Sequence, residues 1–260
     1  MEMFKRLYRY KDLFFIFIFR EFTIRYRHSV LGVIWAIIQP VSMMVLFTFV
    51  FTYLVNFNVS GEYPKMIFFY SALLPWTFFS SSLTYSIPSL RNHYSLITKI
   101  YFPREIIPLS GIATAFVDYL IAGSIFVVLI LLYKIPLTTN IIWLIPLFIL
   151  LVLFTISVSL LLSSLNVYYR DVNLATRFLI QLWFFGSPIL YSIDKVSIKL
   201  KLLLFLNPLT FIIENMRRCM IEGRGVVLWQ LLIVSVLILA LFYFSYKFFI
   251  KTERDFADVI

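Results

Sequence analysis

The sequence predicts an all-α membrane protein with six transmembrane helices, and three observations support this prediction. Hydrophobic residues make up 62% of the chain and charged residues only 14%, whereas soluble domains average about 45–50% and about 25%. Six apolar stretches are long enough to span, since a bilayer core of about 30 Å needs roughly 20 apolar residues. Lipid is therefore the expected solvent for most of the chain. Because it contains no internal repeat and no low-complexity linker, residues 1–260 are expected to form one transmembrane domain.

The amino-terminal segment, residues 1–30, is expected to form an interfacial helix on the cytoplasmic side. Its apolar centre, residues 13–19, covers only about 10 Å at helical rise and cannot span a bilayer. Charged residues flank this centre and favour a position at the membrane surface, with part of the helix packed on protein. The segment lacks the small-residue cleavage site of a signal peptide, so none is expected.

The six predicted spans carry few charges. Asp118 is the charge near the middle of a span, and Arg177 lies near the start of the fifth. An even number of spans places both termini on the same side. The predicted spans are residues 33–57, 66–90, 106–133, 141–166, 174–193 and 226–250.

The distribution of basic residues predicts the orientation. Lys and Arg are concentrated in the amino-terminal segment, in the link between spans two and three, and at the carboxyl end. By the positive-inside rule, both termini are expected in the cytoplasm.

The stretch 194–225, between spans five and six, is expected to form a re-entrant or interfacial helical hairpin on the outer side. Two apolar segments flank Asn207-Pro208, which interrupts a helix, and each half is too short to cross. Its basic residues, including Arg217 and Arg218, oppose the charge rule. We interpret the hairpin as a gate at the outer mouth, with Asn207-Pro208 at its turn and some basic side chains near lipid phosphates or the pyrophosphate of a lipid anchor. A surface amphipathic loop whose basic side chains reach the headgroups is the alternative.

Sequence motifs give little support for catalysis. No glycine pattern matches a phosphate-binding loop, and no catalytic Ser, His or paired-carboxylate motif occurs. The single Cys219 and two histidines are too few for a structural metal site. The basic residues lie beside apolar stretches, so membrane lipids rather than nucleic acid are expected as partners. Asp118 is either the carboxylate of an ion-coupled carrier or a residue satisfied by neighbouring hydroxyls or an arginine from another helix.

Several motifs occur together in the order found in one family. These segments are Arg25-Tyr26-Arg27-His28-Ser29-Val30-Leu31-Gly32 with Trp35 and Gln39-Pro40; Leu74-Pro75-Trp76; Ser89-Leu90-Arg91-Asn92; Lys99-Ile100-Tyr101-Phe102-Pro103-Arg104-Glu105-Ile106-Ile107-Pro108-Leu109; Tyr168-Tyr169-Arg170-Asp171-Val172; and Asn207-Pro208-Leu209. On these segments the chain resembles the permease subunits of type-2 ABC exporters for polysaccharides, over about residues 20 to 225.

The resemblance implies partners and a location. It implies a second copy of the chain and two copies of an ATP-binding cassette subunit, which would bind ATP and Mg²⁺, with no cofactor in this chain. A lipid-linked O-antigen, teichoic acid or capsular glycan would pass along the permease dimer interface. The expected location is the bacterial cytoplasmic (inner) membrane.

The resemblance also implies that residues 91–105 form the cytoplasmic coupling helix seated on the ATPase. The segment combines apolar side chains with a charged rim, and Pro103 stiffens it. Arg170-Asp171 is either a second ATPase contact or an ion pair that caps span five. The expected contact residues are Tyr94, Lys99, Tyr101, Phe102, Pro103, Arg104, Glu105, Arg170 and Asp171.

A glycan channel would need aromatic faces and uncharged hydrogen-bonding groups. Trp35, Gln39 and Ser42 have the spacing of one helix face. Trp183 and Phe184 offer aromatic rings on span five. The alternative is that these rings form a membrane-boundary belt or pack the bundle.

The leading functional hypothesis is therefore the permease of an ATP-driven exporter for a lipid-linked polysaccharide. Two alternatives are a membrane-embedded glycosyl or acyl transferase acting on polyprenyl lipids, and a permease or carrier for small molecules. The first would need an acidic or histidine constellation, and the second would lack Phe102-Pro103-Arg104-Glu105 in this setting.

Overall fold

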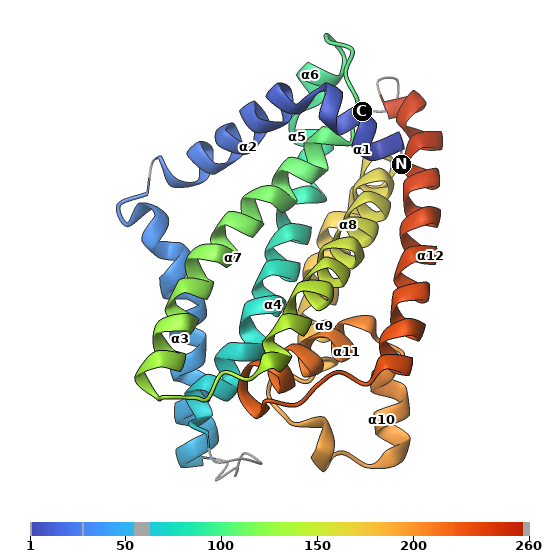
Figure 1. Ribbon diagram of the computed structural model, residues 1–260. Helices are drawn as coiled ribbons and strands as arrows, with labels where there is room; N and C mark the ends of the chain where they lie inside the picture. Colours follow the sequence, from blue (N-terminus) through green and yellow to red (C-terminus); the bar gives the residue numbers. More distant parts are fainter. Residues whose placement is uncertain (1, 28, 55–62, 257–260) are drawn as a thin grey trace.

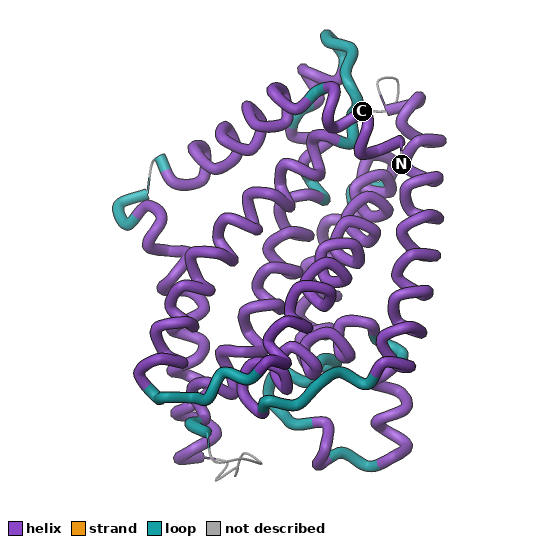
Figure 2. Tube along the Cα trace, in the orientation of Figure 1, coloured by secondary structure: helices purple, strands orange, loops and turns teal. Residues whose placement is uncertain are grey.

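The computed structural model describes residues 2–27, 29–54 and 63–256, and every regular element in these ranges is helical (Figures 1 and 2). Five helical segments in this part are long and apolar enough to cross a membrane: Gly32–Leu54, Lys65–Ser86, Ile106–Leu132, Thr139–Tyr168 and Leu228–Asp255. The prediction of an all-α membrane protein is confirmed. Residues 55–57 of the predicted first span lie outside the described residues.

Six helices run along the long axis of the bundle in alternating directions (Figure 1). They are α3 (Trp35–Phe49), α4 (Lys65–Ser86), α7 (Ile106–Leu132), α8 (Leu144–Tyr168), α9 (Asp171–Phe185) and α12 (Leu228–Thr252).

The helix of the predicted fifth span, α9, is shorter than expected. It has 15 residues, a rise of about 22 Å. Gly186 follows its last residue, and Pro188 then disfavours helix at the residue before it and supplies no backbone donor. The remainder of the predicted span is non-helical over residues 186–192, and Ile193 begins a short 3-10 turn, Ile193–Lys195.

The described ends of the chain meet at one end of the bundle, called the terminal end below (Figure 1). The predicted interfacial helix is two helices there, α1 (Glu2–Arg9) and α2 (Lys11–Tyr26), and α2 packs on α7. Two short helices, α5 (Ser89–Asn92) and α6 (Tyr94–Ile97), lie at the same end.

The opposite end, called the hairpin end, carries α10 (Ile198–Phe205) and α11 (Pro208–Arg217), which a π-helical turn at Arg218–Glu222 continues. The predicted break at Asn207-Pro208 is confirmed. The Asn207 side chain accepts a hydrogen bond from the backbone N–H of Leu209 at 3.1 Å, and Pro208 is the first helical residue. Every residue of α11 is buried, against α4 and α8.

The centre of the bundle is α4, which α3, α7, α8 and α11 surround. Its close contact with α7 depends on Gly111, where an added Cβ would lie 3.2 Å from the backbone nitrogen of Ser86. Small residues at such crossings let helix backbones approach within a membrane. On α7, Ser110 and Thr114 donate to the carbonyls of Ile107 and Ser110 in their own helix.

Candidate functional site

The link between α4 and α7 is the predicted coupling segment, and it is not one helix. The expected helix over residues 91–105 is replaced by α5, α6 and an irregular segment that leads into α7. Its start is fixed by His93, whose Nδ1 lies 2.8 Å from the carbonyl oxygen of Ser89. Pro103 disfavours helix at Phe102, and this explains the interruption.

One side of this segment projects away from the bundle. Tyr101 is 90% exposed, and Tyr94, Lys99 and Ile100 are also exposed. A partner would therefore meet two aromatic rings, an aliphatic side chain and an ammonium group. We call these four residues the coupling face.

Phe102 and Pro103 are buried on the other side of the segment, as is Glu105. The Phe102 ring packs 5.9 Å from that of Phe17 on α2, in a cluster that also holds Phe249 and Phe256. The expectation that Phe102 docks in a partner is corrected, because its ring is already enclosed by this chain. Burial likewise removes Glu105 from the expected charged rim.

Ion pairs tie the coupling segment to both ends of the chain. Arg6 lies 3.2 Å from a carboxylate oxygen of Glu105 and 3.5 Å from one of Glu253. The backbone N–H of Arg104 donates to Glu253 at 2.9 Å, and the Arg104 guanidinium donates to the Glu253 carbonyl. The coupling segment is thus held between α1 and the turn that follows α12. Sequence reasoning missed Arg6 and Glu253 because they lie about 100 and 150 residues from their partners.

The buried carboxyl of Glu105 should make the stability of the fold depend on pH. Burial raises the pKa of its carboxyl from 4.5 to about 7, and Oε1 is buried without a hydrogen-bond partner. The folded state then binds more protons than the unfolded chain between these values, so stability should fall as pH rises through this window. The loss is at most about 3 kcal/mol.

Replacing Glu105 with glutamine should flatten this dependence, because the amide stays neutral. Denaturant unfolding at several pH values, followed by the thiol reactivity of buried Cys219, measures it. Equal pH slopes in the unmodified chain and the variant would contradict a raised pKa at Glu105.

Arg170 and Asp171 are both exposed where α8 leads into α9. The coupling segment reaches this junction through Arg91, whose guanidinium donates to the Val167 carbonyl at 3.3 Å. The two predicted contact regions are therefore neighbours at the terminal end. The exposure of Arg170 and Asp171 leaves them available to a partner.

The channel residues predicted on α3 and α9 differ in their surroundings. Trp35, Gln39 and Ser42 are exposed, as a channel face requires. The Trp183 ring instead packs edge-on against Phe79 and Phe154, and the rings of Phe47 and Trp76 surround Phe184. Packing of the bundle therefore accounts for the position of both rings on α9.

A cavity of about 180 Å³ lies among α2, α3, α4 and α7, and Trp35 and Gln39 line it. Asp118 is satisfied there by an arginine and a hydroxyl, one of the two expected alternatives. Its carboxylate accepts from Arg25 at 2.7 Å and from the Tyr26 hydroxyl at 2.7 Å. Arg25 also lies over the Tyr85 ring, 3.3 Å from its centre.

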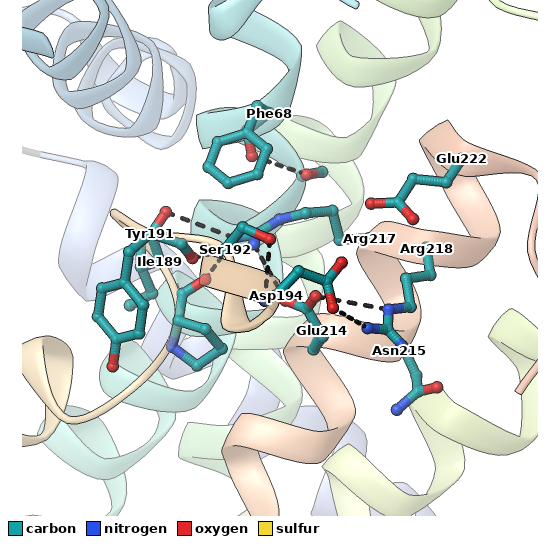
Figure 3. A network of polar contacts seen from close by, with 12 residues as sticks. Phe68, Ile189, Tyr191, Ser192, Asp194, Glu214, Asn215, Arg217, Arg218 and Glu222 are labelled. Atoms are coloured by element: carbon teal, nitrogen blue, oxygen red, sulfur yellow. Dashed lines mark hydrogen bonds and ion pairs between the residues drawn. The ribbon is translucent and has the colours of Figure 1, made fainter. Parts of the chain in front are cut away.

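At the hairpin end, Arg217 is 0% exposed and is surrounded by its own chain (Figure 3). One nitrogen donates to Glu214 at 3.1 Å and to the Tyr191 carbonyl at 3.3 Å. The other donates to the carbonyls of Pro188 and Ile189. The guanidinium also lies 4.0 Å from the centre of the Phe68 ring on α4.

This placement corrects one expectation: Arg217 is enclosed by protein and does not face lipid phosphates. Arg218 is partly exposed and pairs with Asp194 at 3.1 Å and Glu214 at 3.5 Å. The Asn207 amide donates to the Ser187 hydroxyl at 3.2 Å. These contacts join α11 and the hairpin turn to the segment after α9.

Comparisons with known proteins agree with this architecture. The family described as ABC-2 type transporter matches residues 12–221. A Myxococcus xanthus protein named O-antigen export system permease protein RfbA is 27% identical over 264 aligned positions, covering 100% of both chains. A Klebsiella pneumoniae protein of the same name is 30% identical over 213 residues, covering 82% of this chain and 81% of its own.

Proposed function

The chain belongs to the ABC-2 type transporter family, and on that premise we propose that it is the permease of an ATP-driven exporter that moves a lipid-linked polysaccharide across the cytoplasmic membrane. The similarity to two proteins named for O-antigen export, one of them along its whole length, is the observation that carries the proposal. The helical bundle supports the transport role, and the relatives' names support a glycan as the cargo.

The energy would come from an ATP-binding partner seated on the terminal end. Tyr94, Lys99, Ile100 and Tyr101 of the coupling face supply exposed rings, an aliphatic chain and a charge for this contact. Arg170 and Asp171 are the second contact. The segment behind the coupling face is hydrogen-bonded to α1 and to the turn after α12. A displacement of Tyr101 by the partner would therefore be transmitted to both of these elements. ATP and Mg²⁺ belong to the partner, and the terminal end then faces the cytoplasm.

The working unit would hold two copies of this chain and two ATP-binding subunits. The α3 face that carries Gln39 and Ser42, together with exposed apolar side chains of α9 such as Phe178 and Phe185, would line the interface between copies. Gln39 and Ser42 offer uncharged hydrogen-bonding groups to a passing glycan. The hairpin around Asn207-Pro208 would close the outer mouth, with Arg218 at its surface and Arg217 holding it in place.

Reconstitution tests the proposal. The purified chain alone should hydrolyse no ATP above background. Proteoliposomes that contain the chain and its ATP-binding partner subunit should move a lipid-linked glycan to the opposite leaflet only with ATP and Mg²⁺. Leaflet exposure of the glycan to a membrane-impermeant lectin is the measurement.

A matched control uses an ATP-binding subunit whose phosphate-loop lysine is replaced. Glycan movement with that inactive partner would overturn the ATP-driven mechanism. Elongation or modification of the glycan by the chain alone would favour the transferase alternative instead.

A further inference from the structure

The cavity beside Asp118 is a built polar site inside an otherwise apolar bundle. Its lining brings an ion pair together with Gln39, Thr77 and Ser81, while Trp35, Tyr85 and Tyr119 supply ring surface. Its volume of about 180 Å³ slightly exceeds the roughly 150 Å³ of a cavity that holds benzene. The cavity therefore accepts a chemical group the size of a lipid headgroup.

The charges that line the cavity are one cation and one anion. Arg25 and Asp118 are its charged lining residues, and they lie 2.7 Å apart. An anionic group that approached Arg25 would also meet the Asp118 carboxylate, so a phosphate alone gains little. In a zwitterionic group, the anion can pair with Arg25 and the cation with Asp118.

Both members of the ion pair keep hydrogen-bonding capacity. Arg25 contacts Asp118 through Nη1, and a guanidinium has further N–H donors. Each oxygen of Asp118 accepts one hydrogen bond, from Arg25 or from Tyr26, and a carboxylate oxygen can accept a second. A ligand can thus contact both groups without breaking the pair.

The location suits a lipid. Arg25 and Tyr26 end α2, and Trp35 begins α3, so the cavity lies where the surface helix leads into the first span. Basic pockets between membrane helices are known sites for anionic headgroups, and the Asp118 carboxylate gives this pocket a partner for a cationic group as well.

We propose that this cavity binds the zwitterionic headgroup of a phosphatidylethanolamine lipid. The phosphate accepts from Arg25 N–H groups other than the one that pairs with Asp118, and the ammonium donates to Asp118 and to the Thr77 hydroxyl oxygen. The exposed ring of Trp35 offers a face to the same ammonium. The bound lipid fastens the end of α2 to the start of α3. This proposal is independent of the cargo and of the energy source.

The test uses nanodiscs made of phosphatidylethanolamine and phosphatidylglycerol in equal amounts. The full-length chain is released from them and weighed by native mass spectrometry. Phosphatidylethanolamine should be retained over phosphatidylglycerol by about tenfold, the effect of one charge-assisted hydrogen bond. Equal retention of the two lipids, or preference for phosphatidylglycerol, would overturn the proposal.

Two variants connect the retained lipid to this cavity. Ala36→Phe fills the space without touching the ion pair and should abolish the preference. Val236→Phe places an aromatic ring on the exposed side of α12, away from the cavity, and should leave the preference intact. Equal retention by these variants would place the lipid elsewhere.

Asp118→Asn gives a test of charge. It leaves Arg25 as the charge in the cavity, so the preference should move toward phosphatidylglycerol. An unchanged preference would contradict the role of Asp118. Protection of buried Cys219 from thiol reagents confirms that each variant is folded.

Discussion

Replacing Arg217 with leucine is expected to lower the free energy of unfolding by about 3–5 kcal/mol. The guanidinium is fully buried and holds Glu214, three backbone carbonyls and the Phe68 ring together. Without it, the buried Glu214 carboxylate keeps Arg218, at 3.5 Å, as an ion-pair partner but loses the shorter contact with Arg217, and three carbonyls lose their donor. A lysine should not rescue the variant, because one ammonium cannot reproduce the planar set of donors.

The measurement is denaturant unfolding in detergent, with the thiol reactivity of Cys219 as the reporter. Cys219 lies two residues after Arg217 in the sequence, and its buried thiol becomes reactive when this region unfolds. Arg224→Leu is the matched control. Its guanidinium is 69% exposed and lies 3.6 Å from Glu222, so the change should be within about 0.5 kcal/mol. The double variant Arg217→Leu with Glu214→Leu should recover part of the loss, because the buried carboxylate that Arg217 compensates is then removed, while Arg218 keeps Asp194 as its partner. Equal unfolding of Arg217→Leu and Arg224→Leu would refute the anchoring role.

The long apolar helices, α4, α7, α8 and α12, could be predicted from the sequence because membrane spans depend on local apolar length. The stretch from Ile106 to Leu132 illustrates this, since its apolar residues alone indicate a helix across the bilayer. The length of α9 could not be predicted in the same way. The apolar stretch continues past Phe185, so its hydropathy predicts a longer helix. Gly186 and Pro188 nevertheless end the helix at Phe185.

The partners of charged side chains were mostly beyond prediction. Asp118 could be expected to need an arginine or a hydroxyl, but nothing local identifies Arg25 or Tyr26, more than 90 residues away. Arg217 was expected at the lipid surface because most arginines near membranes lie there. Its burial depends on carbonyls that only the turn after α9 presents.

Tyr101 and Phe102 are adjacent aromatic residues, and the sequence does not distinguish their roles. The structure exposes 90% of Tyr101 and encloses Phe102 against Phe17. Phe102→Asp would bury a charge in this chain's own core, so a loss of partner binding would reflect damage to the fold. Tyr101 is therefore the residue whose replacement tests the proposed contact.

Tyr101→Asp is expected to weaken binding of the ATP-binding subunit by about 2 kcal/mol, roughly thirtyfold in Kd, if Tyr101 anchors the contact. An aromatic ring that enters a partner's pocket loses its contact area when it is replaced, and the new carboxylate must be desolvated there. Glycan export should fall with binding. The thermal stability of the chain should be unchanged, because the ring contacts little of its own protein.

Binding is measured with both subunits in detergent, by titrating the ATP-binding subunit against labelled permease. Tyr8→Asp is the control, because Tyr8 is an exposed tyrosine of α1 at the same end of the bundle and outside the coupling face. Tyr101→Phe should keep nearly full affinity if the ring fills a pocket. If Tyr101→Asp binds as tightly as Tyr8→Asp, the partner does not dock on the coupling face. Tight binding with lost export would instead assign Tyr101 to transmission of the motion that follows ATP hydrolysis.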